Sequence, residues 1–424
     1  MRGLWAGLRV LGAVVLGSLL LAGCAGGGGP AKKQLRLFTW TPPDELAINQ
    51  RLIAEFERAH PDIDVQLIND PSQGAMQKLQ TMISAGTAPD VMSIHGAFFV
   101  PFAAKGALLN LEPYAKADRE FNLADFYPRL LDLCRYQGKL YSLPRYASVY
   151  VLFYNRDLFD QAGVPYPDDS WTWETFRRAA QKLTVRSDDP TKARYGCAVD
   201  FWGSRVYPWI WANGGAVVSP DGKRCVVDSP EAQGALQFLV DLNRKYGVVA
   251  PTSQADHRET KEKFKAGRVA MFMSGAWDIQ VLKQATTLNW DVAPLPKAKV
   301  RTTLLGDENY AISARTRHPQ EAWALLAFLL GSKAQITMAN ELEKQPSRIS
   351  VSTGPYLAAK SAYNRKVFVD AVGYGQLAPN LPEWDRVSHY LQDELDRMWL
   401  GKVSVAEGTK KAAERVTAAL HGEL

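Results

Sequence analysis

Apolar and polar positions repeat with two different periods in the first part of the chain. Three short apolar runs have the length and side-chain types of strands, at residues 35–40, 64–68 and 90–94. The two segments between them carry apolar side chains at helical spacing, at residues 44–59 and 75–85. Strand and helix therefore alternate as in β-α-β units, and this pattern predicts a mostly parallel sheet.

The same alternation resumes after a break near residue 145. The predicted strands there are residues 149–154, 195–199, 269–273 and 310–312. The predicted helices are residues 173–183, 232–246, 258–266, 320–330, 386–400 and 405–420. We therefore expect an α/β protein of two bodies, each a mostly parallel sheet flanked by helices.

The break between the two bodies lies in a stretch that is otherwise strand-like. Residues 138–157 are rich in β-branched and aromatic residues, but Pro144 has no N–H to give to an inner ladder. We therefore expect two extended pieces with a break at residues 144–147. Pro296 and the segment 345–348 break the chain again. Strands that cross between two bodies form a hinge, and a hinge leaves a cleft.

The N-terminal residues are organised as an export signal. Two arginines precede an apolar run at residues 10–21, which is short for a membrane span, and small residues follow it. Leu21-Ala-Gly-Cys24 matches the bacterial lipobox, in which the cysteine is lipidated and becomes the N-terminus. We expect a signal peptide at residues 1–23, then lipidated Cys24 and a flexible tether over residues 24–33. The protein would then be anchored by lipid to the outer face of the bacterial cytoplasmic membrane.

The charge of the chain limits its possible partners, and the cysteines limit its possible disulfides. The chain has 50 basic and 44 acidic residues, and removing residues 1–23, with two arginines and no acid, leaves 48 against 44. This excess contains no dense Lys/Arg block, so we expect no nucleic-acid partner. After Cys24, Cys134 is expected to be a buried thiol. Cys197 and Cys225 lie in strand-like runs, and the residues leave open whether they form a disulfide.

Patterns of enzymes and cofactor sites fit this chain poorly. A phosphate-binding loop, Gly-x-Ser-x-Gly and His-x-x-x-His do not occur in the sequence, and Pro379 stands where the helix after Gly373-Tyr-Gly-Gln would have to begin. The six histidines show no metal-ligand spacing. Asp307 and Glu308 are adjacent acids, which point to opposite faces of an extended chain and so do not form a glycosidase pair. We expect no enzyme activity, no cofactor and no metal.

A series of motifs runs through most of the chain in a fixed order. They are Phe56-Glu-Arg-Ala-His-Pro, Ala85-Gly-Thr-Ala-Pro-Asp, Tyr141-Ser-Leu-Pro, Tyr154-Asn-Arg-Asp-Leu-Phe, Trp171-Thr-Trp-Glu-Thr-Phe, Ala212-Asn-Gly-Gly, Phe264-Lys-Ala-Gly-Arg-Val-Ala-Met, Ser274-Gly-Ala-Trp, Pro294-Leu-Pro and Tyr310-Ala-Ile-Ser. With them the chain resembles the family 1 extracellular solute-binding proteins of bacterial ABC importers, which include maltose-binding and glycerol-3-phosphate-binding proteins.

The resemblance implies a periplasmic-binding-protein fold with a ligand cleft at the hinge. One lobe would hold residues 34–144 with 298–344, and the other residues 145–297 with 345–424. The implied partners are a small-molecule ligand, the permease subunits of an ABC importer and the membrane through the lipid anchor, and we expect a monomer. The ligand would be a di- or oligosaccharide, with glycerol 3-phosphate or a glycerophosphodiester as the alternative. A glycoside hydrolase and a ligand-free structural lipoprotein are the remote alternatives.

A sugar has ring faces rich in C–H groups and a rim of hydroxyls, so its site needs flat aromatic side chains beside short polar ones. The aromatic candidates are Trp40 at the end of the first strand, His95 after the third, Trp202 and Trp209 in one aromatic run, and Trp277 after Ser274-Gly-Ala. Trp171, Trp173 and Trp211 are interpreted as packing residues. The polar candidates are Asn69 or Asp70, Tyr146 and Ser148 at the hinge, Asn213, Gly306 to Glu308, and Arg348 at the third break. An anionic ligand would require Arg348 and several backbone N–H donors.

Overall fold

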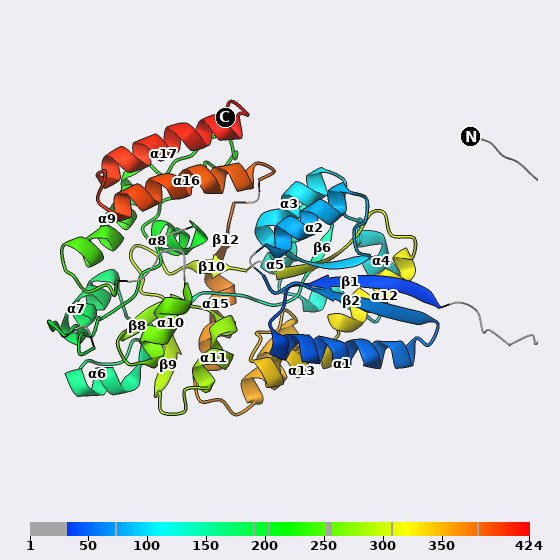
Figure 1. Ribbon diagram of the computed structural model, residues 1–424, viewed down its shortest axis with the longest axis horizontal. Coiled ribbons are helices and arrows are strands. Elements are labelled where there is room, and N and C mark those ends of the chain that lie inside the picture. Colours follow the sequence, from blue (N-terminus) through cyan, green and yellow to red (C-terminus); the bar gives the residue numbers. More distant parts are fainter. Residues whose placement is uncertain are drawn as a thin grey trace, which may run out of the picture.

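The computed structural model describes residues 32–424, apart from residues 73, 190, 202, 252–256, 307 and 380. These residues form two lobes that lie side by side (Figure 1). The predicted signal peptide, Cys24 and almost all of the predicted tether fall outside the described residues, as does Trp202.

The first lobe is built on a five-stranded sheet with the order β2-β1-β3-β11-β6. Its strands are β1 (Lys33–Thr39), β2 (Ile63–Asn69), β3 (Val91–His95), β6 (Ser142–Pro144) and β11 (Glu308–Ile312), with a small hairpin of β4 (Arg135–Tyr136) and β5 (Lys139–Leu140) beside it. Its helices are α1 (Pro43–Ala59), α2 (Ala75–Ser84), α3 (Gly96–Ala104), α4 (Glu112–Ala117), α5 (Pro128–Leu133), α12 (Pro319–Leu329) and α13 (Ser332–Leu342).

The second lobe has a sheet with the order β8-β7-β9 and a two-stranded ladder β10-β12 near the hinge. Its strands are β7 (Val151–Asn155), β8 (Met271–Ser274), β9 (Trp290–Ala293), β10 (Thr303–Leu305) and β12 (Gly375–Leu377). Its helices are α6 (Arg156–Ala162), α7 (Trp173–Leu183), α8 (Tyr207–Ala212), α9 (Pro230–Arg244), α10 (His257–Lys265), α11 (Ile279–Lys283), α15 (Arg365–Tyr374), α16 (Trp384–Trp399) and α17 (Val405–Leu420). Helices α16 and α17 cover the upper end of this lobe (Figure 1).

The direction of each strand follows from how the chain enters its lobe. Strands β1, β2 and β3 run parallel, whereas β11 runs antiparallel to both of its neighbours, β3 and β6. In the second lobe β7 likewise runs antiparallel to both β8 and β9. Strands β7 and β11 are the first strands after the chain has crossed the hinge, so they start at the cleft edge, where the parallel strands end. Strands β4 and β5 also pair antiparallel. The predicted parallel pairing is therefore confirmed for β1 with β2 and β3 and for β10 with β12, whereas the three-stranded sheet of the second lobe contains antiparallel pairs.

Backbone hydrogen bonds join three crossing segments at the hinge. Arg145 N–H donates to Glu308 O (2.8 Å), Ala147 N–H to Gln345 O (3.0 Å), and Gly306 N–H to Ser148 O (2.6 Å). The first and third crossings lie where breaks were predicted. The second lies at Gly306 rather than at Pro296, because Trp173 N–H donates to Lys297 O and Val300 N–H to Ala212 O, which keep this segment on the second lobe.

Each lobe has its own apolar core. In the first lobe Leu37, Phe56 and Leu326 belong to one buried cluster, and in the second Phe159, Leu236 and Leu391 belong to another. Among the described residues no single helix is long and apolar enough to cross a membrane. Helices α12 and α13 reach that length and composition only together, across a bend of 46°, and both contribute buried side chains to the core of the first lobe.

The three described cysteines are free and buried, so a bridge between Cys197 and Cys225 is not present. The backbones of the two cysteines pair with different segments: Cys197 forms an isolated β-bridge with Val249, and Cys225 forms one with Val218. Burial raises the pKa of the Cys225 thiol to about 12 and that of Cys134 to about 12, and it raises the pKa of Cys197 further.

Candidate functional site

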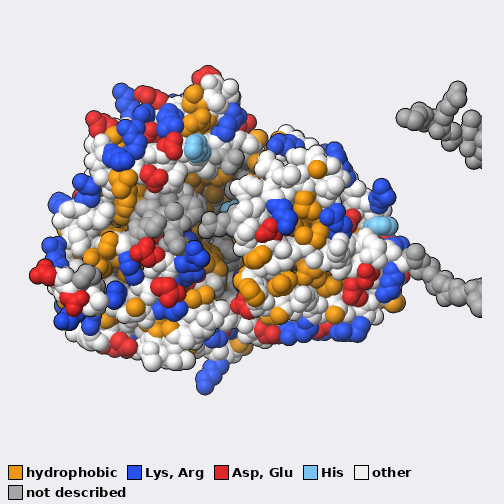
Figure 2. Space-filling view, viewed as in Figure 1, with side chains coloured by type: hydrophobic (Ala, Val, Ile, Leu, Met, Phe, Trp, Pro, Cys, Tyr) orange, Lys and Arg blue, Asp and Glu red, His pale blue; other side chains and the backbone are white. Residues whose placement is uncertain are grey.

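A cavity of about 590 Å³ lies between the two lobes. The space-filling view shows the surface hollowed between the lobes (Figure 2). On the first lobe its lining residues come from the carboxyl ends of β1 and β3, where Trp40 and His95 lie, and from the start of β11. Ligand sites of α/β proteins form at this edge of a parallel sheet, because the loops that follow the strands gather there.

The first-lobe wall is built around the indole of Trp40. Trp40 and His95 meet edge to face, with ring centroids 6.1 Å apart. Trp40 Nε1 donates to Ser93 Oγ (3.1 Å), and Ser93 Oγ donates to Glu308 Oε1 (3.4 Å). The indole is therefore held in place by a polar contact at its edge, while its ring borders the cavity.

The second-lobe wall places Trp277 against Tyr150. Their rings meet edge to face at 5.2 Å. Trp277 follows β8 after a turn that requires Gly275, because a Cβ there would lie 2.2 Å from the indole. Aromatic faces from both lobes thus border one cavity, with Tyr207 and Trp384 further along the second-lobe wall.

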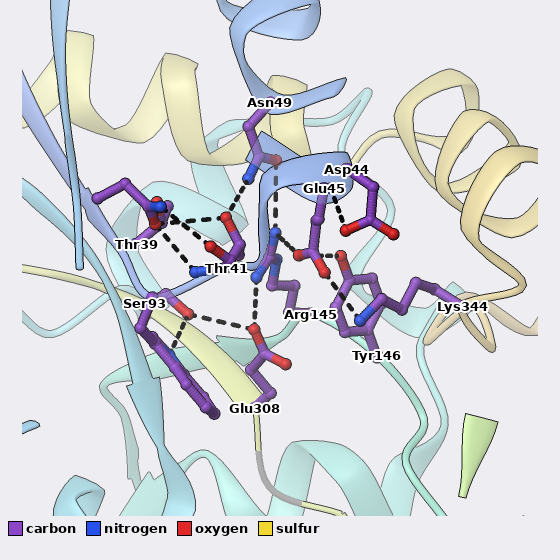
Figure 3. Close-up of polar contacts among 12 residues, drawn as sticks. Thr39, Thr41, Asp44, Glu45, Asn49, Ser93, Arg145, Tyr146, Glu308 and Lys344 are labelled. Carbon is purple, nitrogen blue, oxygen red and sulfur yellow. Dashed lines mark hydrogen bonds and ion pairs between the residues drawn. The ribbon is translucent and has the colours of Figure 1, made fainter. Parts of the chain in front are cut away.

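The charged side chains of Glu45, Glu308 and Lys344 border the same cavity from the first lobe, and Arg145 pairs with two of them. They form a cluster of Glu45, Arg145, Glu308 and Lys344, which we call the hinge charge cluster (Figure 3). Arg145 pairs with Glu308 and with Glu45 (Nη2 to Oε1, 2.5 Å), and Lys344 Nζ lies 2.8 Å from Glu45 Oε2. Tyr146 adds a hydrogen bond from its hydroxyl to Glu45 Oε1 (3.1 Å).

The hinge charge cluster fixes the ionisation of Glu45. Burial alone raises the pKa of this carboxyl, but Arg145 and Lys344 outweigh burial and hold the pKa at about 2. Burial also lowers the pKa of Arg145, and the surrounding Tyr146, Tyr310, Glu45 and Glu308 more than offset this, so its pKa lies well above the ordinary value. Glu45 and Arg145 are therefore both charged at neutral pH.

The charged residue on the second-lobe wall is also paired. Arg205 Nη1 lies 2.9 Å from Asp200 Oδ2, and its guanidinium stands over the Tyr150 ring at 5.4 Å. Each charged side chain among the described lining residues therefore has a partner of opposite sign.

Five of the predicted site residues meet at this cavity. They are Trp40, His95, Ser148, Trp277 and Glu308. Gly306 lies directly behind them, and a Cβ there would approach Ser148 Cβ to 2.6 Å, so glycine lets two crossing segments pack closely.

Two predicted polar residues, Asp70 and Asn213, serve local structure instead. Asp70 follows β2, an edge strand of the sheet, where it accepts from Ser72 N–H (3.0 Å) and pairs with Lys78 (3.1 Å). Asn213 Nδ2 donates to Glu231 O (2.7 Å) in the first turn of α9. The side chain of Asn69, the predicted alternative to Asp70, is hydrogen-bonded to Thr39 and Thr41.

Three further predicted residues are buried away from the cavity surface. Trp209 packs against Trp173 (5.8 Å) and Phe238 (5.9 Å), because all six residues of α8 are buried. Arg348 does not bridge the lobes: its Nε donates to Leu330 O and its Nη2 to Phe121 O, each at 2.7 Å. Tyr146 lies beneath the cavity, in contact with the hinge charge cluster.

Sequence reasoning missed Glu45, Lys344, Tyr150, Arg205 and Trp384. Arg145 is the residue whose sequence context could have indicated the hinge charge cluster. A buried arginine beside Pro144 in an apolar crossing segment needs acidic partners. The sequence alone does not identify those partners, because Glu45 and Glu308 are far away along the chain. Among the described residues no group of three metal-ligating side chains occurs.

Comparison with known proteins gives a consistent result. A model of the family of bacterial extracellular solute-binding proteins matches residues 41–336. The galactooligosaccharide-binding protein of Bacillus subtilis is 22% identical over 94% of this chain and 93% of its own length. An uncharacterized lipoprotein of Streptomyces antibioticus is 27% identical over 78% of this chain and 74% of its own.

A solved structure shares the fold. It is an ABC substrate-binding protein of Listeria monocytogenes in complex with cycloalternan, with a TM-score of 0.84 and 24% identity. The alignment covers 92% of this chain and 99% of that one. The two-lobed arrangement seen here is therefore that of known substrate-binding proteins.

Proposed function

The chain belongs to the bacterial extracellular solute-binding proteins, and we propose that it captures a neutral oligosaccharide between its lobes for an ABC importer. The observation that carries the proposal is one cavity bordered by aromatic faces from both lobes, Trp40 on one side and Trp277 with Tyr150 on the other. Aromatic faces stack on the C–H faces of sugar rings, and the charged groups at the edge receive hydroxyls. The galactooligosaccharide-binding and cycloalternan-bound relatives support the same ligand class.

Charge balance favours a neutral ligand over a phosphate ester. A phosphate site uses cations and N–H donors that are free to meet the anion. In this cavity Lys344 is engaged by Glu45, and Arg205 is engaged by Asp200. Arg348, which the anionic alternative needs, is bound to backbone oxygens elsewhere. A glycerol-phosphate ligand is therefore disfavoured.

The state of the carboxylates argues against glycoside hydrolysis. That reaction needs one carboxylic acid that keeps its proton near neutral pH. With a pKa of about 2, Glu45 is ionised at neutral pH and has no proton to donate. Glu308 is held in an ion pair with Arg145.

Export, anchoring and delivery complete the proposal. The basic and apolar N-terminus with Leu21-Ala-Gly-Cys24 supports a lipoprotein, and the Streptomyces relative is a lipoprotein. A lipid anchor would hold the two lobes near the membrane permease that receives the sugar. Closure of the lobes on the ligand would then provide the form that the permease recognises.

A binding screen tests the proposal directly. The chain from residue 24 onward, unlipidated, is titrated calorimetrically with maltotriose, a galactotriose, the corresponding disaccharides and glycerol 3-phosphate. We expect saturable binding of at least one saccharide series and no heat from glycerol 3-phosphate. Binding of glycerol 3-phosphate alone would contradict the neutral-ligand assignment, and no binding of any saccharide would contradict the proposed function.

A further inference from the structure

Arg145 connects the three segments that cross between the lobes. It follows Pro144 in the first crossing, and its guanidinium pairs with Glu308, which begins β11 after the second crossing. Its other partner, Glu45, bonds Lys344, which lies after α13 at the start of the third crossing. Figure 3 shows the guanidinium between the two carboxylates.

The two ends of the hinge charge cluster border the cavity together with Glu45, whereas Arg145 does not. Glu308 and Lys344 are lining residues, each with 17% of the side chain exposed, but the Arg145 side chain is 2% exposed. The described contacts connect Glu308 to Lys344 through Arg145 and Glu45. A ligand group that touches either end therefore meets a side chain whose position depends on Arg145.

Stability alone gives little reason for such a cluster. Buried ion pairs lose much of their attraction to desolvation, and apolar side chains of similar volume often stabilise a fold as well or better. What a buried cluster does provide is mutual dependence, because the low dielectric makes each charge sensitive to the exact place of the next. At a hinge this dependence connects ligand contacts to the crossing segments.

We propose that Arg145 is a positioning residue that couples the ligand contacts of Glu308 and Lys344 on the first-lobe wall beside the hinge. This inference rests on the proposed function. A sugar hydroxyl that orients Glu308 also fixes Arg145, and through Glu45 it fixes Lys344, so the two contacts are cooperative. Because Arg145 lies in a crossing segment, the same interactions also hold that segment against the first lobe at the hinge.

A double-mutant cycle on binding measures this coupling. The dissociation constants of the wild type, Glu308→Gln, Lys344→Met and the double variant are measured by calorimetry with maltotriose, or with the saccharide that binds most tightly in the screen above. If the two residues act independently, the fold-losses in affinity of the two single variants multiply to give that of the double variant to within about twofold. We expect the double variant to depart from the product of the single losses by about fivefold or more, because either substitution already breaks the connection.

The matched control combines Lys344→Met with Trp277→Ala. Both residues border the cavity, but Trp277 lies on the other lobe and its ring contact is with Tyr150. We expect these losses to multiply to within about twofold. A third arm repeats the first cycle in Arg145→Met, or in Arg145→Lys if the first does not fold, and the coupling should fall to the level of the control. A merely structural role of Arg145 would weaken binding and leave this coupling unchanged.

The outcomes distinguish a failure of the proposed role of Arg145 from a failure of the proposed function. If the wild type binds the sugar and the fold-losses in affinity of Glu308→Gln and Lys344→Met simply multiply in the double variant, the proposed role of Arg145 is overturned. The proposed function is then left standing. Coupling that persists without Arg145 also overturns it. A wild type that binds no saccharide overturns the proposed function and this inference together.

Discussion

One group of buried charges in this protein lies beside the cavity, at the hinge. Glu45 is 2% exposed and is ionised because two cations, Arg145 and Lys344, surround it. An uncompensated carboxylate at this depth would be neutral, since desolvation alone raises its pKa. The ionised state of Glu45 at this depth therefore depends on the two cations beside it.

The stability of the protein should depend on pH through Glu45. Its pKa is about 2 in the folded state against an ordinary value of 4.5, so the fold favours the ionised form. This contribution is complete above about pH 4.5 and is lost as the pH falls toward 2, with a total of about 3 kcal/mol. We expect the gap in free energy of unfolding between wild type and Glu45→Gln to shrink by roughly that amount between pH 5 and pH 2 in urea titrations. Glu414→Gln, at an exposed position, is the control, and a constant gap for both variants would contradict the prediction.

Trp277 should carry a large part of the ligand affinity. Its ring borders the cavity beside Tyr150, and stacking a sugar face on it removes apolar area of both from water. We expect Trp277→Ala to weaken saccharide binding by about 1.5–3 kcal/mol, roughly tenfold to hundredfold, as measured by calorimetry. Tyr166→Ala removes an exposed aromatic residue from the same lobe and should bind normally. Equal affinities of wild type and Trp277→Ala would show that the ring does not touch the ligand.

The three described cysteines should behave as inert thiols. Burial raises the pKa of each, so the thiolate that attacks alkylating reagents is scarce at pH 8. We expect iodoacetamide to leave peptides with Cys134, Cys197 and Cys225 unmodified in the native protein and to label all three in urea without a reductant. Labelling of Cys197 and Cys225 only after reduction would show a disulfide that the structure does not contain.

At the scale of elements, local patterns predicted the long helices well, but the predicted strand at residues 195–199 forms only isolated bridges. Contacts between residues distant in sequence did not follow from local patterns. Helices α7 and α17 begin and end where periodicity placed them, because Thr172 and Ser404 cap them with capping boxes. Helix α3 was missed, since its run Gly96–Ala104 is apolar all round and contains Pro101. The reversal of β7 and β11 depends on where the chain crosses the hinge, and no short-range pattern contains that information.

Three of the predicted residues that border the cavity lie at or just after the end of a strand. Trp40, His95 and Trp277 follow β1, end β3 and follow β8 respectively, so strand prediction located them. Trp209 failed because periodicity cannot tell which face of the short helix α8 is covered when every face is buried. Lys344 and Glu45 were missed because their importance comes from Arg145, which is distant from both in the sequence.

The turn after β8 offers a test of how an element positions a ligand contact. The backbone of Gly275 is extended (φ −129°, ψ −174°), so alanine fits its conformation, but an added Cβ would lie 2.2 Å from the Trp277 indole. We expect Gly275→Ala to displace the ring and to lower saccharide affinity by about the same factor as Trp277→Ala. Calorimetry with the variants gives the comparison. Gly373→Ala, where a Cβ would meet open space, is the control. Unchanged affinity in Gly275→Ala would mean that the indole position does not matter for binding.

For the whole molecule, the lobes meet on both sides of the crossing segments. Helix α16 contacts α3 next to the cavity, and Gln280 of α11 donates to Glu341 O of α13 (2.6 Å) on the opposite side (Figure 1). Lys283 also pairs with Glu343 there (2.8 Å). Arg365 and the Tyr363 hydroxyl of the second lobe contact the same carboxylate and are buried, and each lobe has an extensive core of its own. The relative position of the lobes therefore depends on polar contacts beside the crossing segments, which a ligand in the cavity can supplement.

Ligand binding should consequently couple the unfolding of the two lobes. A saccharide at a hundredfold excess over its dissociation constant stabilises the form it binds by about 2.7 kcal/mol. Since that form needs contacts from both lobes, unfolding either one releases the sugar, and the stabilisation applies to whichever lobe unfolds first. We expect differential scanning calorimetry to show a broad transition without ligand and a narrower one at higher temperature with it. Trp40→Ala removes the first-lobe aromatic face, so a higher sugar concentration should be needed before the unfolding transition of this variant becomes narrower. A ligand that raised one component of the transition and left the other in place would show that it binds one lobe only, and closure around the ligand would then not occur.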